Sequence, residues 1–331
     1  MRISTQEIQE KLYEILINYN FRKEKAQILA QIFTESSTDG IYSHGLDRFP
    51  RFIQNVKDGL VEVDADPEKF GSFGNVEQWN GNLGPGILNA RHCMKRAMEI
   101  AEKAGIGCVA LSNTNHWMRG GSYGWQAAEE GFIGICWTNT APNMVAWGGK
   151  QPALGNNPFI IGIPRPEGHI VLDMAMSQFS FGKMQSYAME GMKLPYPGGW
   201  DNKGVLTSDP KVILSNERAL PIGYWKGSGL SFVLDLLAAL LSKGDPTCRI
   251  GRRGDEYGLS QIFIALNIKW LDREYLDNII EETIQNVHGS EPLKEGENIF
   301  YPGERTIITR IDNQRLGIPV HNETWRKILN L

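Results

Sequence analysis

A short segment, IYSHGLDRFPR over residues 41–51, gathers side chains that could carry out chemistry at one corner of the chain. Histidine has an unperturbed pKa of about 6.5, which suits the delivery of a proton to a nascent alkoxide. A guanidinium can bind a carboxylate through two parallel hydrogen bonds. His44 with Arg48 or Arg51 could therefore supply both groups to a site that reduces a keto acid. The alternative is a surface corner whose arginines pair with Asp47 or remain solvated.

A second polar segment, NTNHWMRGGSYG over residues 113–124, follows a run typical of a β-strand and leads into a helical pattern. Binding sites in α/β proteins favour the carboxyl ends of strands, and the glycines here allow a ligand to approach the backbone closely. His116 could thus face a substrate. It could equally be the histidine of a capped loop, satisfied by a neighbouring carbonyl. The sequence leaves both interpretations open.

The chain lacks the usual dinucleotide fingerprint, G-x-G-x-x-G after a strand. Its nearest approaches are Gly84-Pro85-Gly86 and Gly227-Ser228-Gly229, and neither completes the triplet. Lys226 and the glycines that follow it precede a long apolar helix, and there they could offer a cation and exposed N–H groups to a phosphate. The alternative is a tight turn that lets this helix pack closely.

Composition excludes several other classes of protein. The 34 basic and 38 acidic residues of the 331 give a net charge of −4 without a long basic run, so we expect neither nucleic acid nor an anionic membrane as the main partner. No zinc-type histidine spacing and no H-E-x-x-H motif occurs, and we expect neither a metal site nor a serine hydrolase. The four cysteines form no C-x-x-C pair, which indicates a reduced, cytoplasmic protein.

The termini and the apolar runs carry no targeting signal that we can identify. The N-terminus, MRISTQEIQEKLYEIL, is polar and periodic and does not have the form of a secretory signal. No apolar stretch approaches the roughly 18 residues that a membrane-spanning helix requires. A length of 331 residues suits two domains or one large one.

Periodicity predicts helical ends and a middle in which helices alternate with strands. Such alternation is typical of an α/β layer structure with a largely buried sheet. The expected strands are 106–111, 132–138, 159–163, 170–174 and 262–268. The expected helices are 5–20, 23–38, 52–58, 88–104, 125–130, 230–241, 275–287, a segment after Pro302-Gly303, and a last helix opened by Asn322 and Thr324.

Three stretches resemble one known family. The segments YSHGLDRFPRFI, NHWMRGGSYGWQAAEEGFIGICWTN and GYWKGSGLSFVLDLLAALLS are similar to the type-two malate/L-lactate/L-sulfolactate dehydrogenases. The similarity continues through DEYGLSQIFIA to the C-terminal PGE, and so covers nearly the whole chain. The second stretch is long, aromatic and specific, whereas the isolated glycines are not.

The resemblance implies a fold and an assembly. It implies an α/β, non-Rossmann nucleotide-binding domain with a mixed sheet, which accounts for the missing fingerprint. A helical domain would be formed by both chain ends, residues 1–70 together with 272–331, around an NAD-binding domain of residues 71–271. Members of the family are homodimers or larger, so we expect a homodimer.

The resemblance also assigns roles to residues. His44, in the SHG motif, would be the proton donor, while chemistry and placement suggest Arg48 for the substrate carboxylate and His116 for its oxygens. The residues expected to contact the cofactor NAD fall in three segments: His169, Ile170, Val171, Leu172, Asp173, Met174 and Ala175; Trp225 and Lys226; Gly303, Glu304 and Arg305. Carboxylates at Asp173 and Glu304 would accept from ribose hydroxyls and repel a 2′-phosphate, which favours NADH over NADPH.

The reaction expected from the resemblance is the reduction of a 2-oxo acid by hydride transfer. Alternatively, the chain is a dehydrogenase of a smaller 2-hydroxy acid, of the L-lactate, malate or ureidoglycolate type. Substrate preference could be set by residues 140–150 and 179–199, where the sequence departs from its nearest relatives. A rival of another class is a non-catalytic protein that binds a small sugar acid through Arg48.

Overall fold

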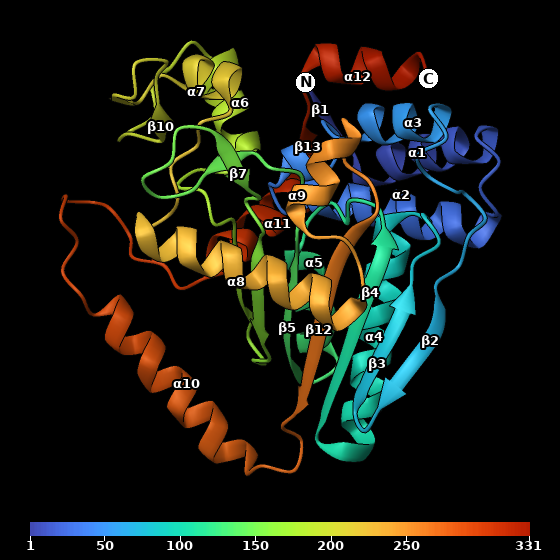
Figure 1. The fold of residues 1–331 in the computed structure, drawn as a ribbon. Helices are drawn as coiled ribbons and strands as arrows, with labels where there is room; N and C mark the ends of the chain where they lie inside the picture. Colours follow the sequence, from blue (N-terminus) through green and yellow to red (C-terminus); the bar gives the residue numbers. More distant parts are fainter.

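A seven-stranded mixed sheet forms the centre of the molecule in the computed structural model, which describes residues 1–331 (Figure 1). Its strand order is β2-β3-β4-β12-β5-β8-β9, and only the β3–β4 pair is parallel. The mixed sheet confirms the predicted fold class. Its strands are β2 (Glu68–Phe73), β3 (Val76–Asn80), β4 (Ile106–Thr114), β5 (Phe132–Thr138), β8 (Phe159–Ile163), β9 (Ile170–Met174) and β12 (Leu259–Asn267).

Helices cover both faces of this sheet (Figure 1). On one face lie α4 (Gly86–Ala104) and α5 (Gly121–Glu129), whose apolar residues share a core with the strands. On the other face α8 (Trp225–Ser242) crosses the strands, together with α6 (Phe181–Met189) and α7 (Pro210–Asn216) beyond it. The central strand β12 is accordingly buried on both faces, which fits its apolar sequence.

A second region is helical and joins the two ends of the chain. In α1 (Thr5–Asn18) the Ser4 side chain accepts from the Glu7 N–H, and apolar residues at helical spacing face inward. They share one core with α2 (Lys23–Thr38), α3 (Phe49–Lys57) and α12 (Asn322–Leu329). The strand β1 (Arg2–Ile3) pairs with β13 (Ile318–Pro319), so the termini lie side by side. The division into domains at residues 70 and 272 stays a prediction.

Two further helices connect these regions. The helix α11 (Glu304–Leu316) passes from the β9 edge of the sheet to α2. By contrast, α10 (Arg273–His288) extends away from the body of the molecule, with Ile284 as its one buried residue (Figure 1). The remaining elements are short: β6 (Met144–Val145), β7 (Pro152–Leu154), β10 (Gly199–Trp200), β11 (Leu206–Thr207), α9 (Thr247–Ile250) and two 3-10 turns, Tyr42–His44 and Gly251–Arg253.

Several sequence-based boundaries were wrong. The third helix begins at Phe49 and not at 52, α5 begins at Gly121, and α8 begins at Trp225, five residues before the expected start. The strands β2 and β3 and the helices α6 and α7 were not predicted. The expectation that no segment could span a membrane also needs correction, because α8 has the length and composition of a span. A third of that helix is buried, and it packs on the sheet.

Candidate active site

The first candidate segment is a tight corner at the end of α2. After Asp39 the chain turns through Gly40, whose φ is +81°, into the 3-10 turn that ends at His44. Gly45 then packs on α2 so closely that a Cβ there would lie 2.1 Å from the Ser37 hydroxyl, while Ser37 Oγ accepts from the Leu46 N–H at 2.9 Å. The SHG motif therefore fixes where His44 can lie, because no side chain fits at its glycine.

The second segment brings His116 next to His44. His116 follows β4, and its ring stacks on that of His44 with the centroids 5.9 Å apart and the planes inclined by 26°. Its Nδ1 accepts from the Met118 N–H at 2.9 Å, so the neutral ring carries its proton on Nε2. The Nδ1 of His44 lies 3.1 Å from the Ser43 hydroxyl. The structure thus joins two residues that lie 72 positions apart, without assigning either one a role.

Arg48 belongs to the same cluster, whereas Arg51 does not. The electrostatic effect of Arg48 lowers the pKa of both histidines, which places its charge near them. It takes part in no ion pair. Arg51 instead lies 3.6 Å from Asp255, and Asp47 accepts from Thr324. An unpaired guanidinium beside two imidazoles is available to bind an anion. Neither arginine pairs with Asp47, and the role of Arg48 stays a prediction.

Both histidines are neutral at neutral pH. Burial, then the charges of Arg48 and Arg119, lower the pKa of His44 to about 4. Burial and the same Arg48 charge lower the pKa of His116 as well. A carboxylate bound at Arg48 would oppose this effect, because its negative charge favours the imidazolium.

The three segments expected to contact a cofactor meet at the β9 edge of the sheet. The Val171 N–H donates to Pro302 O at 2.9 Å, which holds the start of α11 against β9. Beyond the end of β9 the Ile222 N–H donates to Met176 O at 2.8 Å, which holds the segment before α8 next to this edge. Asp173 accepts from the Gly121 N–H at 2.8 Å, so the loop after His116 also reaches this edge. The roles of these residues stay predictions.

The residues at this edge fit a nicotinamide dinucleotide. Gly303 has φ +98°, and a Cβ there would lie 2.9 Å from Val171 N, so this glycine lets the start of α11 pack closely against β9. The exposed cations Lys226 and Arg305 suit a pyrophosphate, and the exposed Asp173 suits a hydroxyl or amide donor. Glu304 fits less well as a ribose acceptor, because its Oε2 already accepts from Tyr301 N at 3.1 Å and lies 3.0 Å from His288 Nε2. His169 Nδ1 accepts from Arg165 N at 3.1 Å.

Of the two interpretations of the glycine turn before α8, the structure favours the tight turn. These residues lie in the first turn of the helix and not ahead of it. The N–H groups of Lys226 and Gly227 already donate to Gly223 O at 3.2 Å and Ile222 O at 2.9 Å. A Cβ at Gly227 would lie 2.2 Å from Ile222 O, so this glycine allows close packing. Of that segment, only the Lys226 side chain remains available to an anion.

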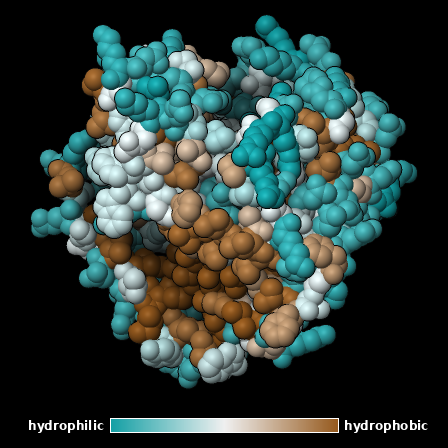
Figure 2. Space-filling model, viewed as in Figure 1, coloured by the Kyte–Doolittle hydropathy of each residue, from teal (hydrophilic) through white to brown (hydrophobic).

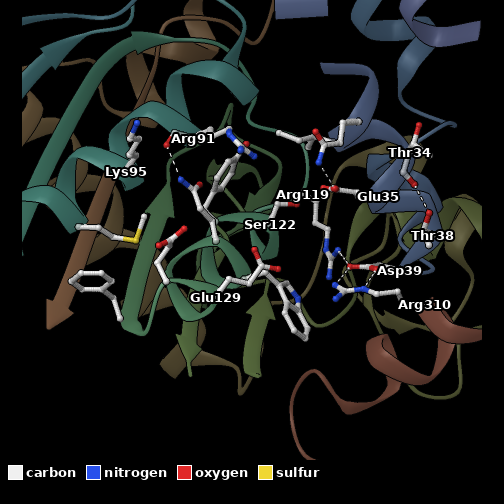
Figure 3. Close-up of a pocket in the computed structure, with 18 of the residues that line it drawn as sticks. Thr34, Glu35, Thr38, Asp39, Arg91, Lys95, Arg119, Ser122, Glu129 and Arg310 are labelled. Carbon is white, nitrogen blue, oxygen red and sulfur yellow. Dashed lines mark hydrogen bonds and ion pairs between the residues drawn. The ribbon is translucent and has the colours of Figure 1, made fainter. Parts of the chain in front are cut away.

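A large cavity lies elsewhere. It encloses about 1120 Å³ between α2, α4, α5 and α11, and its lining mixes acidic with basic side chains (Figure 3). None of His44, Arg48 and His116 lines it. Its inner wall contains a buried network of Asp39, Arg119 and Arg310 that sequence reasoning missed. No local pattern marks this network, because its members come from three distant parts of the chain.

The sequence and the fold match known dehydrogenases over their full length. The family described as malate/L-lactate dehydrogenase matches residues 3–329. The chain belongs to this family. It is 43% identical over 330 residues to a 2,3-diketo-L-gulonate reductase of Escherichia coli O127:H6 and 44% identical to one of Salmonella paratyphi A, with 99% of each chain covered.

Solved structures agree with this assignment. A malate dehydrogenase from Entamoeba histolytica superposes with a TM-score of 0.94 at 26% identity, covering 100% of this chain and 96% of that one. A sulfolactate dehydrogenase from Methanocaldococcus jannaschii gives 0.88 at 28% identity, with 99% and 95% covered. The chain is therefore an oxidoreductase of the kind that acts on CH–OH groups, and its family indicates a nicotinamide cofactor.

Proposed function

We propose that this protein reduces 2,3-diketo-L-gulonate to 3-dehydro-L-gulonate with NADH in the cytoplasm. The observation that carries the proposal is the cluster of His44, His116 and the unpaired Arg48, in a chain that matches reductases of this name from end to end. The cluster provides a group that binds a carboxylate beside a group that can deliver a proton. A 2-oxo acid needs both.

Arg48 binds the substrate carboxylate with parallel hydrogen bonds and so fixes the adjacent carbonyl beside the imidazoles. The bound carboxylate offsets the Arg48 charge, which raises the pKa of His44 from its low value and favours its protonation. His44 then donates this proton to the developing alkoxide. His116, with its proton on Nε2, donates a hydrogen bond to a substrate oxygen. The residues at the β9 edge would hold the nicotinamide, which would supply the hydride.

The cofactor would be held by His169–Ala175, Trp225, Lys226 and Gly303–Arg305. We propose NADH over NADPH, because the Asp173 carboxylate at this edge would accept from a ribose hydroxyl and repel a 2′-phosphate. The measurement is kcat/KM for each cofactor with the same substrate. A higher value with NADPH would reverse the assignment.

We also propose a homodimer that buries the outer face of α8. Most of this face is exposed and apolar, and Figure 2 shows it as the broad hydrophobic region of the surface. Over its 18 residues α8 carries only two charged side chains, Lys226 and Asp235. A face of this composition is complementary to itself, so a two-fold axis would place it against its own copy. Leu240, 70% exposed, is its most accessible large apolar residue.

The dimer is tested by light scattering of wild type and Leu240→Glu. The measured mass of wild type should be twice the chain mass of 37.1 kDa, and the mass of the variant should fall toward that of the monomer as the protein is diluted. Wild type that stays monomeric at micromolar concentrations would contradict the proposal.

The substrate is tested by a panel of acids with NADH and NADPH: 2,3-diketo-L-gulonate, pyruvate, oxaloacetate and 2-oxobutyrate. The proposal predicts the highest kcat/KM with 2,3-diketo-L-gulonate. A preference for a smaller acid would instead support the alternative, a lactate, malate or ureidoglycolate type of dehydrogenase, which the structural likeness to malate and sulfolactate dehydrogenases makes the second candidate. If the protein neither bound NADH nor turned over any of the acids, both candidate functions would be refuted.

A further inference from the structure

The network on the inner wall of the large cavity connects three segments of the proposed site: the corner that carries His44, the loop that carries His116, and α11. Asp39 is 4% exposed and ends α2, five residues before His44. One of its carboxylate oxygens pairs with Arg119, three residues after His116. Arg310, in α11, donates to both carboxylate oxygens, from Nε at 2.6 Å and from Nη2 at 2.8 Å (Figure 3).

Packing around this carboxylate makes the connection rigid. A Cβ at Gly40 would lie 2.8 Å from Cγ2 of Thr309, so α11 rests directly on the corner. The buried Asn313, also in α11, donates to Thr38 O at 3.0 Å and to the hydroxyl of Tyr42 at 3.3 Å. Arg310 lies over the Trp125 ring, with its guanidinium carbon 4.4 Å from the centroid.

The network also carries an excess positive charge. Two guanidiniums share one carboxylate, and Arg119 is itself 5% exposed. A single carboxylate that pairs with two cations, the buried Arg119 and the half-buried Arg310, holds both in fixed directions, because loss of the anion would leave the two cations close together. Its geometry therefore fixes where Arg119, and the loop that carries His116, can lie.

We propose that Asp39 is a positioning residue that holds the His44 corner, the His116 loop and the α11 segment with Gly303–Arg305 in one arrangement. The inference rests on the proposed function of these three segments. Asp39 acts through Arg119 and Arg310 and does not touch the substrate. Its loss should impair the reaction far more than it impairs folding, since a displacement of about 1 Å at a reacting group can reduce the rate by about 10²-fold.

The test compares Asp39→Asn with a matched control, Glu77→Gln. Glu77 is equally buried, and it accepts from Arg96 at 2.9 and 2.8 Å and from the Trp79 indole at 3.0 Å. It lies in β3, toward the edge of the sheet opposite β9. Both substitutions remove one buried carboxylate charge and keep the shape of the side chain, so both should lower the melting temperature.

Only Asp39→Asn should change the site. We expect its kcat/KM to fall by about 10²-fold, mostly through kcat, and Glu77→Gln to stay within about threefold of wild type. The ring-proton NMR shifts of His44 and His116, which report on their stacking, should move in Asp39→Asn and not in the control. This readout needs neither cofactor nor substrate, so it tests the inference even if the substrate assignment fails.

A second variant keeps the test decisive if Asp39→Asn does not fold. Arg310→Gln removes one member of the network whose side chain is 30% exposed and leaves the Asp39–Arg119 pair in place. We expect about a tenfold loss of kcat/KM and a change in the same ring shifts. Unchanged kinetics and shifts in a folded Arg310→Gln or Asp39→Asn would overturn the inference. Equal losses in Asp39→Asn and Glu77→Gln would overturn it too, because stability alone would then explain them.

Discussion

The low pKa of His44 predicts an unusual pH dependence for the reduction. In the free protein the pKa is about 4, so the fraction protonated is about 10^(4−7), or roughly one molecule in a thousand, at pH 7 and roughly one in a hundred at pH 6. Because kcat/KM reports the free protein, it should rise about tenfold between pH 7 and pH 6. An unperturbed histidine, with a pKa of about 6.5, would give only about a threefold rise over the same interval.

The assay is the initial rate of NADH oxidation at substrate concentrations well below KM, from pH 8 to pH 5.5, corrected for the acid decay of NADH. The value of kcat should vary less steeply than kcat/KM, because the bound carboxylate offsets the charge of Arg48 in the complex. Arg48→Gln should lower kcat/KM and flatten the acid end of its profile, since it removes the second cause of the low pKa of His44 while burial, the largest cause, remains. Arg51→Gln is the matched control, because Arg51 pairs with Asp255 and should leave the profile unchanged.

A rise of threefold or less in wild type, or the same flattening in both arginine variants, would refute the reasoning. The first result would mean that the proton comes from a group with an ordinary pKa. The second would mean that Arg48 has no special influence on His44.

Three further predictions concern stability and binding. The pKa of His44 is lower in the folded state than in the unfolded state, so between pH 6.5 and about 4 the unfolded state takes up a proton that the folded state does not. As the pH falls through that window, wild type should lose up to roughly 3 kcal/mol of unfolding free energy relative to His44→Asn. Urea unfolding measures this difference, and a parallel loss in both proteins would contradict the prediction. Arg48→Gln should raise KM for the substrate by roughly 10–100-fold with little change in the Kd for NADH, since a charge-assisted pair contributes about 1.5–3 kcal/mol. Steady-state kinetics and NADH titration measure the two constants, and an unchanged KM would mean that a different cation binds the carboxylate. Gly303→Ala should weaken NADH binding and lower stability by about 1–3 kcal/mol, because its φ is +98° and the new Cβ would meet Val171 N; calorimetry that finds wild-type affinity would mean that the backbone at Gly303 does not contact the cofactor.

Local pattern was enough to predict much of the fold. The helices α1 and α2 and the strands β5, β8 and β9 match their predicted ranges within about two residues, because each shows a clear apolar period. The strands β2 and β3 were missed, since EKFGSF and VEQWN alternate weakly and their residues are mostly accessible. The apolar sequence of α8 is typical of a helix buried all round, yet one face is exposed, because nothing in this chain covers it.

The candidate site was predictable only in part. Residue types singled out His44, Arg48 and His116 separately, but their meeting depends on long-range packing that periodicity does not report. The network of Asp39 and Arg310 joins positions 271 residues apart, so no pattern in the local sequence could indicate it. The two interpretations of the glycine turn at Lys226 could not be separated from the sequence, because its N–H groups donate to the chain just before the helix, a pairing that depends on the fold.

The central claim, that His44 delivers the proton in an NADH-dependent reduction, is tested most directly by a single turnover. Protein loaded with stoichiometric NADH is mixed with 2,3-diketo-L-gulonate, and loss of NADH fluorescence is followed in wild type and in His44→Ala. The account predicts rapid oxidation in wild type and a rate lower by about 10²–10⁴-fold in the variant, with NADH bound equally well by both. Oxidation in His44→Ala at a rate within about threefold of wild type would contradict it and transfer the role to another group, with His116 the first to test.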